Sequence, residues 1–322
     1  MRGRASTVLL VRLAQVPLVL AVLSALVFVL VRAVPGDQGR DALGPEASPA
    51  QVHAWKVAHG LEGSVIEQYL GWAGRLLTGD WGTSIVYAVP VRELVLERAV
   101  NSLVLGLSAF VLLVPLALGL GALQARREGS RTDRGLTVGL MALTAVPEFV
   151  VGVLLLVGFA LLVPLFPVQS TAGSGAGFGP HLRAMVLPAV TLALGSLAVV
   201  ARTARTGIID ALEEPFHRTA VLKGLHPRQT FRAHVARNAL IPTVSVLAAT
   251  LGALVAGSAV VETLFGYPGL GGLLVTATQR KDVDVLAAGV LLVGLLTLIA
   301  VALADVVSVW MDPRVRFHGA DA

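Results

Sequence analysis

Six long apolar stretches run along this chain and are separated by polar segments. A run of about 18 or more apolar residues can cross the hydrocarbon core of a bilayer. In lipid such a run must be helical, because a helix pairs its backbone N–H and C=O groups within the segment. The pattern predicts an all-α membrane protein with six transmembrane helices, at approximately Val8–Val31, Ala99–Leu123, Gly135–Phe166, Met185–Ala201, Ala239–Val261 and Val285–Met311.

The placement of basic residues predicts how these helices are oriented. Arginine and lysine concentrate before the first stretch, between the second and third, between the fourth and fifth, and after the sixth. Cytoplasmic loops of membrane proteins carry the excess of Lys and Arg, so both termini are expected in the cytoplasm. The net charge of +5 therefore indicates topology, and we expect no nucleic-acid partner.

Composition argues against several kinds of site. The 322-residue chain is 55% hydrophobic and 14% charged, which favours one helical bundle over two soluble domains. It has no cysteine, and its seven histidines do not form the His-Glu-x-x-His arrangement of a zinc peptidase. We therefore expect no metal site. Because no nucleophile stands in a pattern with a base, we also expect no catalytic residue.

The same patterns divide the chain into segments. They are residues 1–34 with the first helix, an extracytoplasmic segment 35–98, and a core 99–322 with a cytoplasmic loop at about 202–240. In the outer segment, Gln51–His59 and Val65–Leu77 have the spacing of short amphipathic helices. Pro147 is expected to kink the third apolar stretch, because proline removes a backbone donor and its ring clashes with the preceding turn.

The loop before the fifth apolar stretch is patterned as a helical hairpin. Pro215 suits the first turn of a helix, and Gly224 suits the position just past its end. Pro227 can open a second helix that leads into the fifth stretch. Phe216 and Ala220 belong to a short apolar strip that would suit docking into a partner's groove. Capping signals specify structure and not binding, so the residues alone leave open both a docking helix and a solvated hairpin.

Short motifs occur in a fixed order along nearly the whole chain. Residues 219–225 read TAVLKGL, and residues 237–242 read RNALIP. These two stretches resemble the EAA loop of ATP-binding-cassette importer permeases, in the peptide and nickel branch of that family. Position 218 is Arg where the general importer motif has Glu, and in this departure the chain resembles the peptide and nickel branch. Further similar stretches are PGD at 35–37, GDWGTS at 79–84, VETLF at 261–265, YPGLG at 267–271 and DPRVR at 312–316.

The resemblance implies a six-helix bundle of the type I importer permease, with both termini in the cytoplasm. In such importers two homologous permease subunits form the pathway, two cytoplasmic ATPases bind ATP and Mg²⁺, and an extracytoplasmic binding protein delivers the substrate. This chain would be a non-catalytic, multi-pass subunit of the bacterial inner membrane, surrounded by lipid. Its lysines agree with that division, because none follows the glycine-rich loop of a phosphate site. The resemblance assigns contact with the ATPase to Phe216, Arg218, Thr219, Ala220, Lys223, Gly224 and Leu225.

Two acidic residues in apolar surroundings are candidates for the translocation path. Glu148 lies about a dozen residues into the third stretch, near mid-membrane at about 1.5 Å per residue. An ionisable group there is costly and indicates either a solute path or a partner for a polar group on a neighbouring helix. Glu262 is expected at the outer end of the fifth stretch, where it could meet substrate or binding protein or mark the membrane boundary.

Short peptides are the expected substrate. The alternatives within the family are nickel, a metal chelate or an opine-like solute, and the outer loops show no cluster of His or carboxylates that would select a metal. An ion-coupled secondary transporter is the alternative from another class. It is disfavoured because such proteins tend to contain internal repeats, and none is evident in this sequence.

Overall fold

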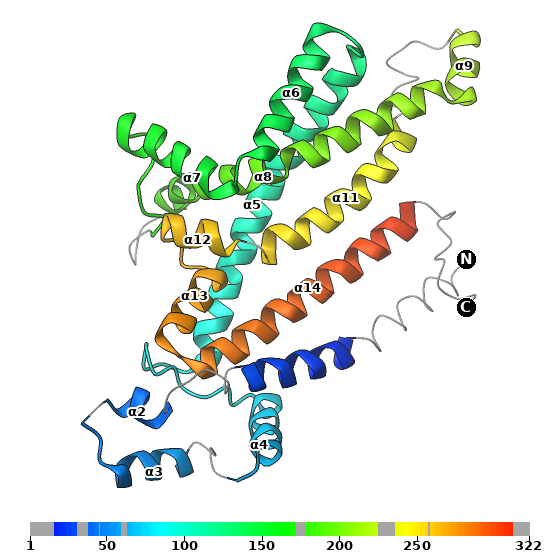
Figure 1. The fold of residues 1–322 in the computed structure, drawn as a ribbon. Coiled ribbons are helices and arrows are strands. Elements are labelled where there is room, and N and C mark those ends of the chain that lie inside the picture. Colours follow the sequence, from blue (N-terminus) through cyan, green and yellow to red (C-terminus); the bar gives the residue numbers. More distant parts are fainter. Residues whose placement is uncertain are drawn as a thin grey trace.

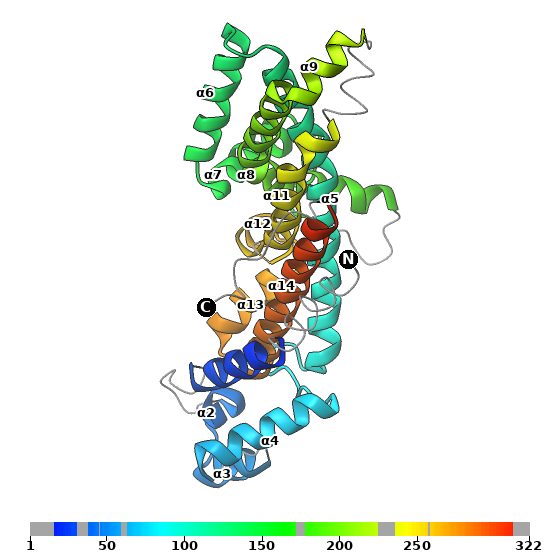
Figure 2. The same ribbon diagram turned by 90° about the vertical axis from the view of Figure 1, so that its right-hand side faces the viewer.

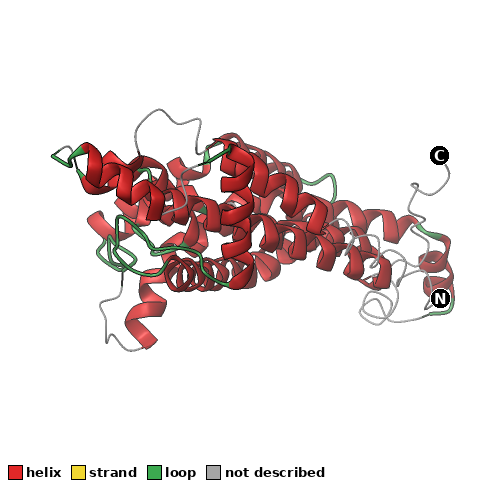
Figure 3. Ribbon diagram, turned by 90° about the horizontal axis from the view of Figure 1, so that it is seen from below, coloured by secondary structure: helices red, strands yellow, loops and turns green. Residues whose placement is uncertain are grey.

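The computed structural model describes residues 16–30, 38–44, 46–58, 63–171, 178–224, 236–256 and 258–311. Within these ranges the regular elements are helices, accompanied by one isolated antiparallel bridge between Thr83 and Pro90 (Figure 3). A first helix covers Val16–Leu30. The elements that follow are α2 (Gln38–Leu43), α3 (Pro49–Ala58), α4 (Val65–Thr78), α5 (Val91–Arg126), α6 (Arg131–Ala145), α7 (Glu148–Leu156), the π-helix η1 (Val157–Leu162), α8 (Phe178–Glu213), α9 (Pro215–Leu222), α11 (Ala236–Ala256), α12 (Ala259–Phe265), α13 (Leu270–Arg280) and α14 (Val283–Met311).

The all-α membrane fold predicted from the apolar stretches is confirmed. Three helices, α5, α8 and α14, are each long and apolar enough to cross a membrane. The number rises to five if α6 with α7 and η1 forms one bent span and α11 with α12 forms another. The first helix is shorter, and the beginning of its apolar stretch lies outside the described residues. The count of six spans and the orientation of the termini stay predictions.

Pro147 interrupts the third apolar stretch more strongly than a kink would. α6 ends at Ala145, α7 begins at Glu148, and the two parts meet at 98°. Pro147 has the extended ψ of 140° and is the N-cap of α7, where its missing N–H costs nothing. The expectation of one continuous kinked helix was therefore wrong, although the position of the bend was right.

Two predicted boundaries fall inside continuous helices. α8 was expected to end near Ala201 but runs on to Glu213, so residues 202–213 of the predicted loop are helical. The extra turns persist because Ile208 and Ala211 stay buried in a cluster with Ala125 of α5. α5 begins at Val91, so residues 91–98 of the proposed outer segment also belong to a core helix.

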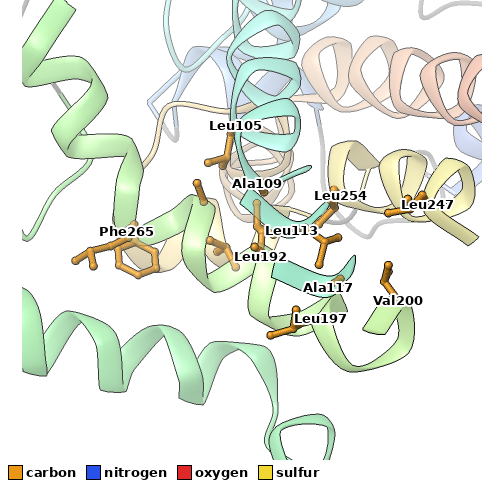
Figure 4. Packing of buried hydrophobic residues seen from close by; sticks show 14 of the residues in the cluster. Leu105, Ala109, Leu113, Ala117, Leu192, Leu197, Val200, Leu247, Leu254 and Phe265 are labelled. Atoms are coloured by element: carbon orange, nitrogen blue, oxygen red, sulfur yellow. The ribbon is translucent and has the colours of Figure 1, made fainter. Parts of the chain in front are cut away.

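The main core lies where α5 crosses α8 and α11 (Figure 4). Leu105, Ala109, Leu113 and Ala117 repeat every fourth residue, line one face of α5 and are fully buried. Against them pack Leu192, Leu197 and Val200 of α8, Leu247 and Leu254 of α11, and Phe265 of α12. The small side chains on α5 let the helix backbones approach closely.

The outer segment forms three short helices at one end of the molecule (Figures 1 and 2). The two predicted helices there are confirmed as α3 and α4. α4 begins with a capping box, in which Ser64 Oγ accepts from the N–H of Glu67 and the Glu67 carboxylate accepts from the N–H of Ser64. These hydrogen bonds hold the pKa of Glu67 below its usual value. Tyr69 and Trp72 then pack against Phe28 of the first helix, with ring centroids 5.4 and 5.6 Å away.

Candidate functional site

The break at Pro147 opens a cavity in the bundle. It has a volume of about 360 Å³ and lies between the α6–α7 break, α8 and α11. Its apolar wall includes Val151, Leu192 and Leu254, and its polar side includes the hydroxyls of Thr144 and Ser196. Glu148 is the one charged residue among those that line it.

Glu148 is half-buried and stands at the first position of α7. In the part of the chain that the structure describes, its carboxylate forms no hydrogen bond and no ion pair. Gly195 of α8 lies directly opposite, since a Cβ at that position would be 3.4 Å from Glu148 Cδ. The sequence predicted that Glu148 is an acidic residue within the membrane-spanning region. The structure shows that Glu148 also lines a cavity.

Glu262 is buried in the bundle interior and is not presented at a surface. Its Oε1 accepts hydrogen bonds from Ser102 Oγ of α5 and Ser258 Oγ, both at 2.5 Å. Its Oε2 accepts from the backbone N–H of Gly272 in α13 at 2.8 Å. The carboxylate is 0% exposed and joins α5, α12 and α13. Burial removes Glu262 from contact with a substrate or binding protein at a surface of the described chain, and this set of partners gives it a structural role.

The YPGLG stretch is bound to α5 beside this carboxylate. Tyr267 Oη donates to the carbonyl of Asn101, and Asn101 Nδ2 donates to the carbonyl of Pro268. The N–H of Leu270 donates to Ser102 Oγ at 2.8 Å. Gly269 has to lack a side chain, because a Cβ there would overlap the Glu262 carboxylate. The motif therefore fixes the turn between α12 and α13.

The GDWGTS stretch is fixed in a comparable way, through a residue that sequence reasoning missed. Ser84 Oγ donates to Asp282 Oδ2 at 2.5 Å, and the N–H of Val86 donates to the same oxygen. Asp282 lies in the turn between α13 and α14 and is 1% exposed. A signal for the turn was present, because the polar residues 279–282 (QRKD) separate two apolar stretches. The partner of Asp282, 198 positions earlier, was not visible there.

α9 and its turn have the local structure that the capping signals predicted. Pro215 is the first residue of the helix, and Gly224 follows its end with the left-handed φ of +72°. Ala220 is buried, whereas Leu222 is 87% exposed and Lys223 and Gly224 are exposed. Thr219 Oγ1 donates to the Pro215 carbonyl within the helix at 3.0 Å.

Part of the predicted contact set cannot be placed. The backbones of Phe216 and Arg218 belong to α9, but their side chains lie outside the described residues, as do Leu225 and the helix expected from Pro227. The described part of α9 therefore has one buried residue, Ala220, and an exposed end at Leu222–Gly224.

α9 lies at the end of the molecule that is opposite to α2–α4 (Figures 1 and 2). The α5–α6 turn is at the same end as α9, and it carries Arg126, Arg127 and Arg131. The cavity beside Glu148 lies between these ends, at the crossing of α8 and α11 with the α6–α7 break.

Comparison with known proteins identifies the type of molecule that has this geometry. Residues 117–317 match the family of the binding-protein-dependent transport system inner membrane component, and residues 6–89 match the N-terminal part of such membrane components. The chain belongs to this permease family. The resemblance that the short motifs indicated is thereby confirmed.

Relatives of the permease cover nearly its full length. The probable peptide ABC transporter permease protein y4tP of Sinorhizobium fredii is 30% identical over 95% of this chain and 98% of its own. The oligopeptide transport system permease protein AppB of Bacillus subtilis is 31% identical over 95% and 97%. The dipeptide transport system permease protein DppB of Lactococcus lactis is 30% identical over 96% and 98%.

Family membership fixes the general role of the chain. It is a multi-pass membrane protein and the permease component of an ATP-binding-cassette transporter. A permease component is a non-catalytic subunit of such a transporter.

Proposed function

We propose that this permease forms one half of the membrane pathway of an importer for short peptides. A second, homologous permease would form the other half, two cytoplasmic ATPases would bind ATP and Mg²⁺, and an extracytoplasmic binding protein would deliver the peptide. The observation that carries the proposal is family membership together with the exposed helix α9 at the end of the molecule opposite to α2–α4.

The proposed topology is six transmembrane helices with both termini in the cytoplasm of a bacterium, in its inner membrane. Two observations support it: the arginines of the α5–α6 turn lie at the same end of the molecule as α9, and α2–α4 lie at the other end. Positive residues favour the cytoplasmic side of a membrane. Residues 35–90 would then lie outside the membrane, and residues 91–322, from the start of α5, would form the core permease domain.

α9 is proposed to dock into a groove on the ATPase, with Gly224 forming the sharp turn after it. Because Leu222 is largely exposed and α9 follows directly after α8, a rigid movement of the ATPase would be transmitted to α8. Phe216, Arg218, Thr219, Lys223 and Leu225 would complete the contact surface.

Peptides are favoured as the substrate because the relatives that span the whole chain are named as peptide, dipeptide or oligopeptide permeases. Nickel, a metal chelate or an opine-like solute is the alternative, since a separate binding protein selects the solute in such systems.

Reconstitution tests this proposal. The permease is placed in vesicles with a homologous partner permease and the two ATPases, the binding protein is supplied, and uptake of a labelled tripeptide is measured with Ni²⁺ uptake in parallel. We expect ATP-dependent tripeptide uptake that stops when the ATPases or the binding protein are left out. Uphill uptake by the permease alone would contradict the proposal, and uptake of Ni²⁺ without tripeptide would overturn the substrate.

A further inference from the structure

The cavity beside Glu148 combines features that point to a particular kind of ligand. Among its lining residues, one carboxylate and the hydroxyls of Thr144 and Ser196 are the polar side-chain groups, and the remaining lining is apolar or backbone. Thr144 Oγ1 already donates its proton to the carbonyl of Leu140, so its oxygen faces a ligand as an acceptor. An acceptor-rich wall with one negative charge suits a group that only donates hydrogen bonds and carries a positive charge.

No cation of the described chain neutralises this carboxylate. Arg205, on the same helix as Gly195, is bound to Asp133. It also lies ten residues further along α8, which is about 15 Å at the rise of a helix. Arg183 donates to the carbonyl of Leu165. An ionisable group at membrane depth is costly unless something pairs with it, and among the described residues Glu148 lacks that pair.

We propose that Glu148 forms a transient site for the basic side chain of a transported peptide, so that the permease itself favours peptides that contain lysine or arginine. This inference rests on the proposed peptide-import function. The ammonium or guanidinium group would contact the carboxylate and the two hydroxyl oxygens. The aliphatic stem would lie along the apolar wall formed by Val151, Leu192 and Leu254.

The dimensions of the site fit one side chain and not a whole peptide. A cavity of about 360 Å³ is at the small end of the range in which small-molecule sites are found. The site would therefore hold the basic side chain while the rest of the peptide stays in the pathway. The same carboxylate would repel an anionic side chain, so the site would favour basic over acidic side chains.

Two variants separate charge from space. Glu148→Gln removes the charge and keeps the shape of the side chain. Gly195→Ala keeps the charge but places a methyl group 3.4 Å from Glu148 Cδ and 3.5 Å from Oε1, an ordinary van der Waals distance that covers one side of the carboxylate. Alanine also suits the interior of α8 better than glycine, so this variant is expected to fold.

The experiment measures import into vesicles that contain the complete transporter, with the binding protein saturated. The probes are Ala-Lys-Ala and Ala-Met-Ala, and the readout is the ratio of their uptake rates, with ATP hydrolysis recorded in parallel. Glu148→Gln is expected to lower the Ala-Lys-Ala rate about tenfold, the size expected for a lost charged hydrogen bond, and to change the Ala-Met-Ala rate less than about twofold. Gly195→Ala is expected to shift the ratio of uptake rates in the same direction by a smaller factor. Glu148→Asp keeps the charge and is expected to keep most of the preference for Ala-Lys-Ala.

An unchanged ratio in Glu148→Gln, or an equal loss for both peptides, would overturn the inference; an equal loss would assign the carboxylate to pairing with the second permease. If Glu148→Gln no longer co-purifies with the ATPases, Gly195→Ala decides, and an unchanged ratio there overturns the inference as well. Should the unmodified transporter import neither tripeptide, the proposed function fails, and the inference fails with it. If the unmodified transporter imports both tripeptides and the variants leave the ratio of their uptake rates unchanged, the inference fails while the proposed function stands.

Discussion

Arg205 of α8 holds Asp133 of α6 in a bidentate ion pair, with Nε and Nη2 donating to Oδ1 and Oδ2 at 2.9 and 2.8 Å. Asp133 is 4% exposed, and its Oδ2 also accepts from the N–H of Gly129 in the preceding turn at 3.1 Å. The pair therefore fixes the α5–α6 turn against α8, at the same end of the molecule as α9.

Removing the arginine should destabilise the bundle. Arg205→Ala leaves a buried carboxylate without its cation, which costs about 3 kcal/mol in comparable buried pairs. We expect a lower midpoint of thermal unfolding for the purified permease in detergent. The matched control is Arg202→Ala, because Arg202 is exposed and lies one turn earlier on the same helix. This variant should lose no more than about 0.5 kcal/mol of unfolding free energy. Equal midpoints for the two variants would show that the pair contributes no net stability.

Two glycines on α5 should respond differently to the same substitution. A Cβ on Gly121 would lie 2.7 Å from the carbonyl oxygen of Ala201 and 2.8 Å from Ala204 Cβ, whereas a Cβ on Gly119 meets no atom within 4 Å. Gly121→Ala therefore overpacks the α5–α8 contact and should destabilise by about 1–3 kcal/mol. Gly119→Ala should be neutral or stabilising by up to about 1 kcal/mol, because alanine favours the helix. Thermal unfolding of both variants, measured under one condition, checks the difference, and the reverse order would contradict the observed packing.

Local features of this fold could be predicted from the sequence, and partners far apart along the chain could not. The spacing of apolar residues predicted α3 and α4, and Pro215 and Gly224 mark the ends of α9 by local chemistry. Such features depend on neighbours within a few residues. Helix ends inside apolar stretches depend on tertiary packing, which is why α8 runs past Ala201 to Glu213.

The candidate site shows the same division. The sequence singled out Glu148 and Glu262 as acidic residues in apolar stretches, but it did not distinguish them. Glu262 has two serine hydroxyls and a backbone N–H as partners, of which Ser102 lies 160 residues away. Glu148 faces a cavity whose walls come from α6, α7, α8 and α11. Only the arrangement of the helices separates a satisfied carboxylate from an unpaired one.

The partners of Glu262 lead to a third prediction. Ser102 Oγ donates to Glu262 and accepts from the N–H of Leu270, so Ser102→Ala removes a donor from a buried carboxylate and an acceptor from a buried N–H. The expected loss is about 1–3 kcal/mol, the range for buried polar groups left unsatisfied. Ser108→Ala serves as the control on the same helix, because Ser108 Oγ bonds only the Val104 carbonyl of its own helix. A similar unfolding midpoint for the two variants would contradict the structural role of the Ser102–Glu262 contact.

The turn after α9 gives a prediction about coupling. Gly224 and Gly129 have nearly the same left-handed φ, +72° and +71°, and a Cβ on either would meet no atom within 4 Å. Aspartate at either position therefore has the same backbone cost, and its Cβ does not clash with the described residues. Gly129 lies in the α5–α6 turn, at the same end of the molecule.

If the Gly224 turn docks on the ATPase, only Gly224→Asp brings a charged side chain into that contact. We expect it to lower peptide uptake per ATP hydrolysed about tenfold, which corresponds to about 1.4 kcal/mol of lost docking energy. Gly129→Asp should leave that ratio within about twofold, because Gly129 is exposed and contacts Asp133 through its backbone N–H, which aspartate keeps. Both quantities are measured in the same reconstituted vesicles. Equal losses in the two variants would mean that backbone strain, and not docking at Gly224, accounts for the effect.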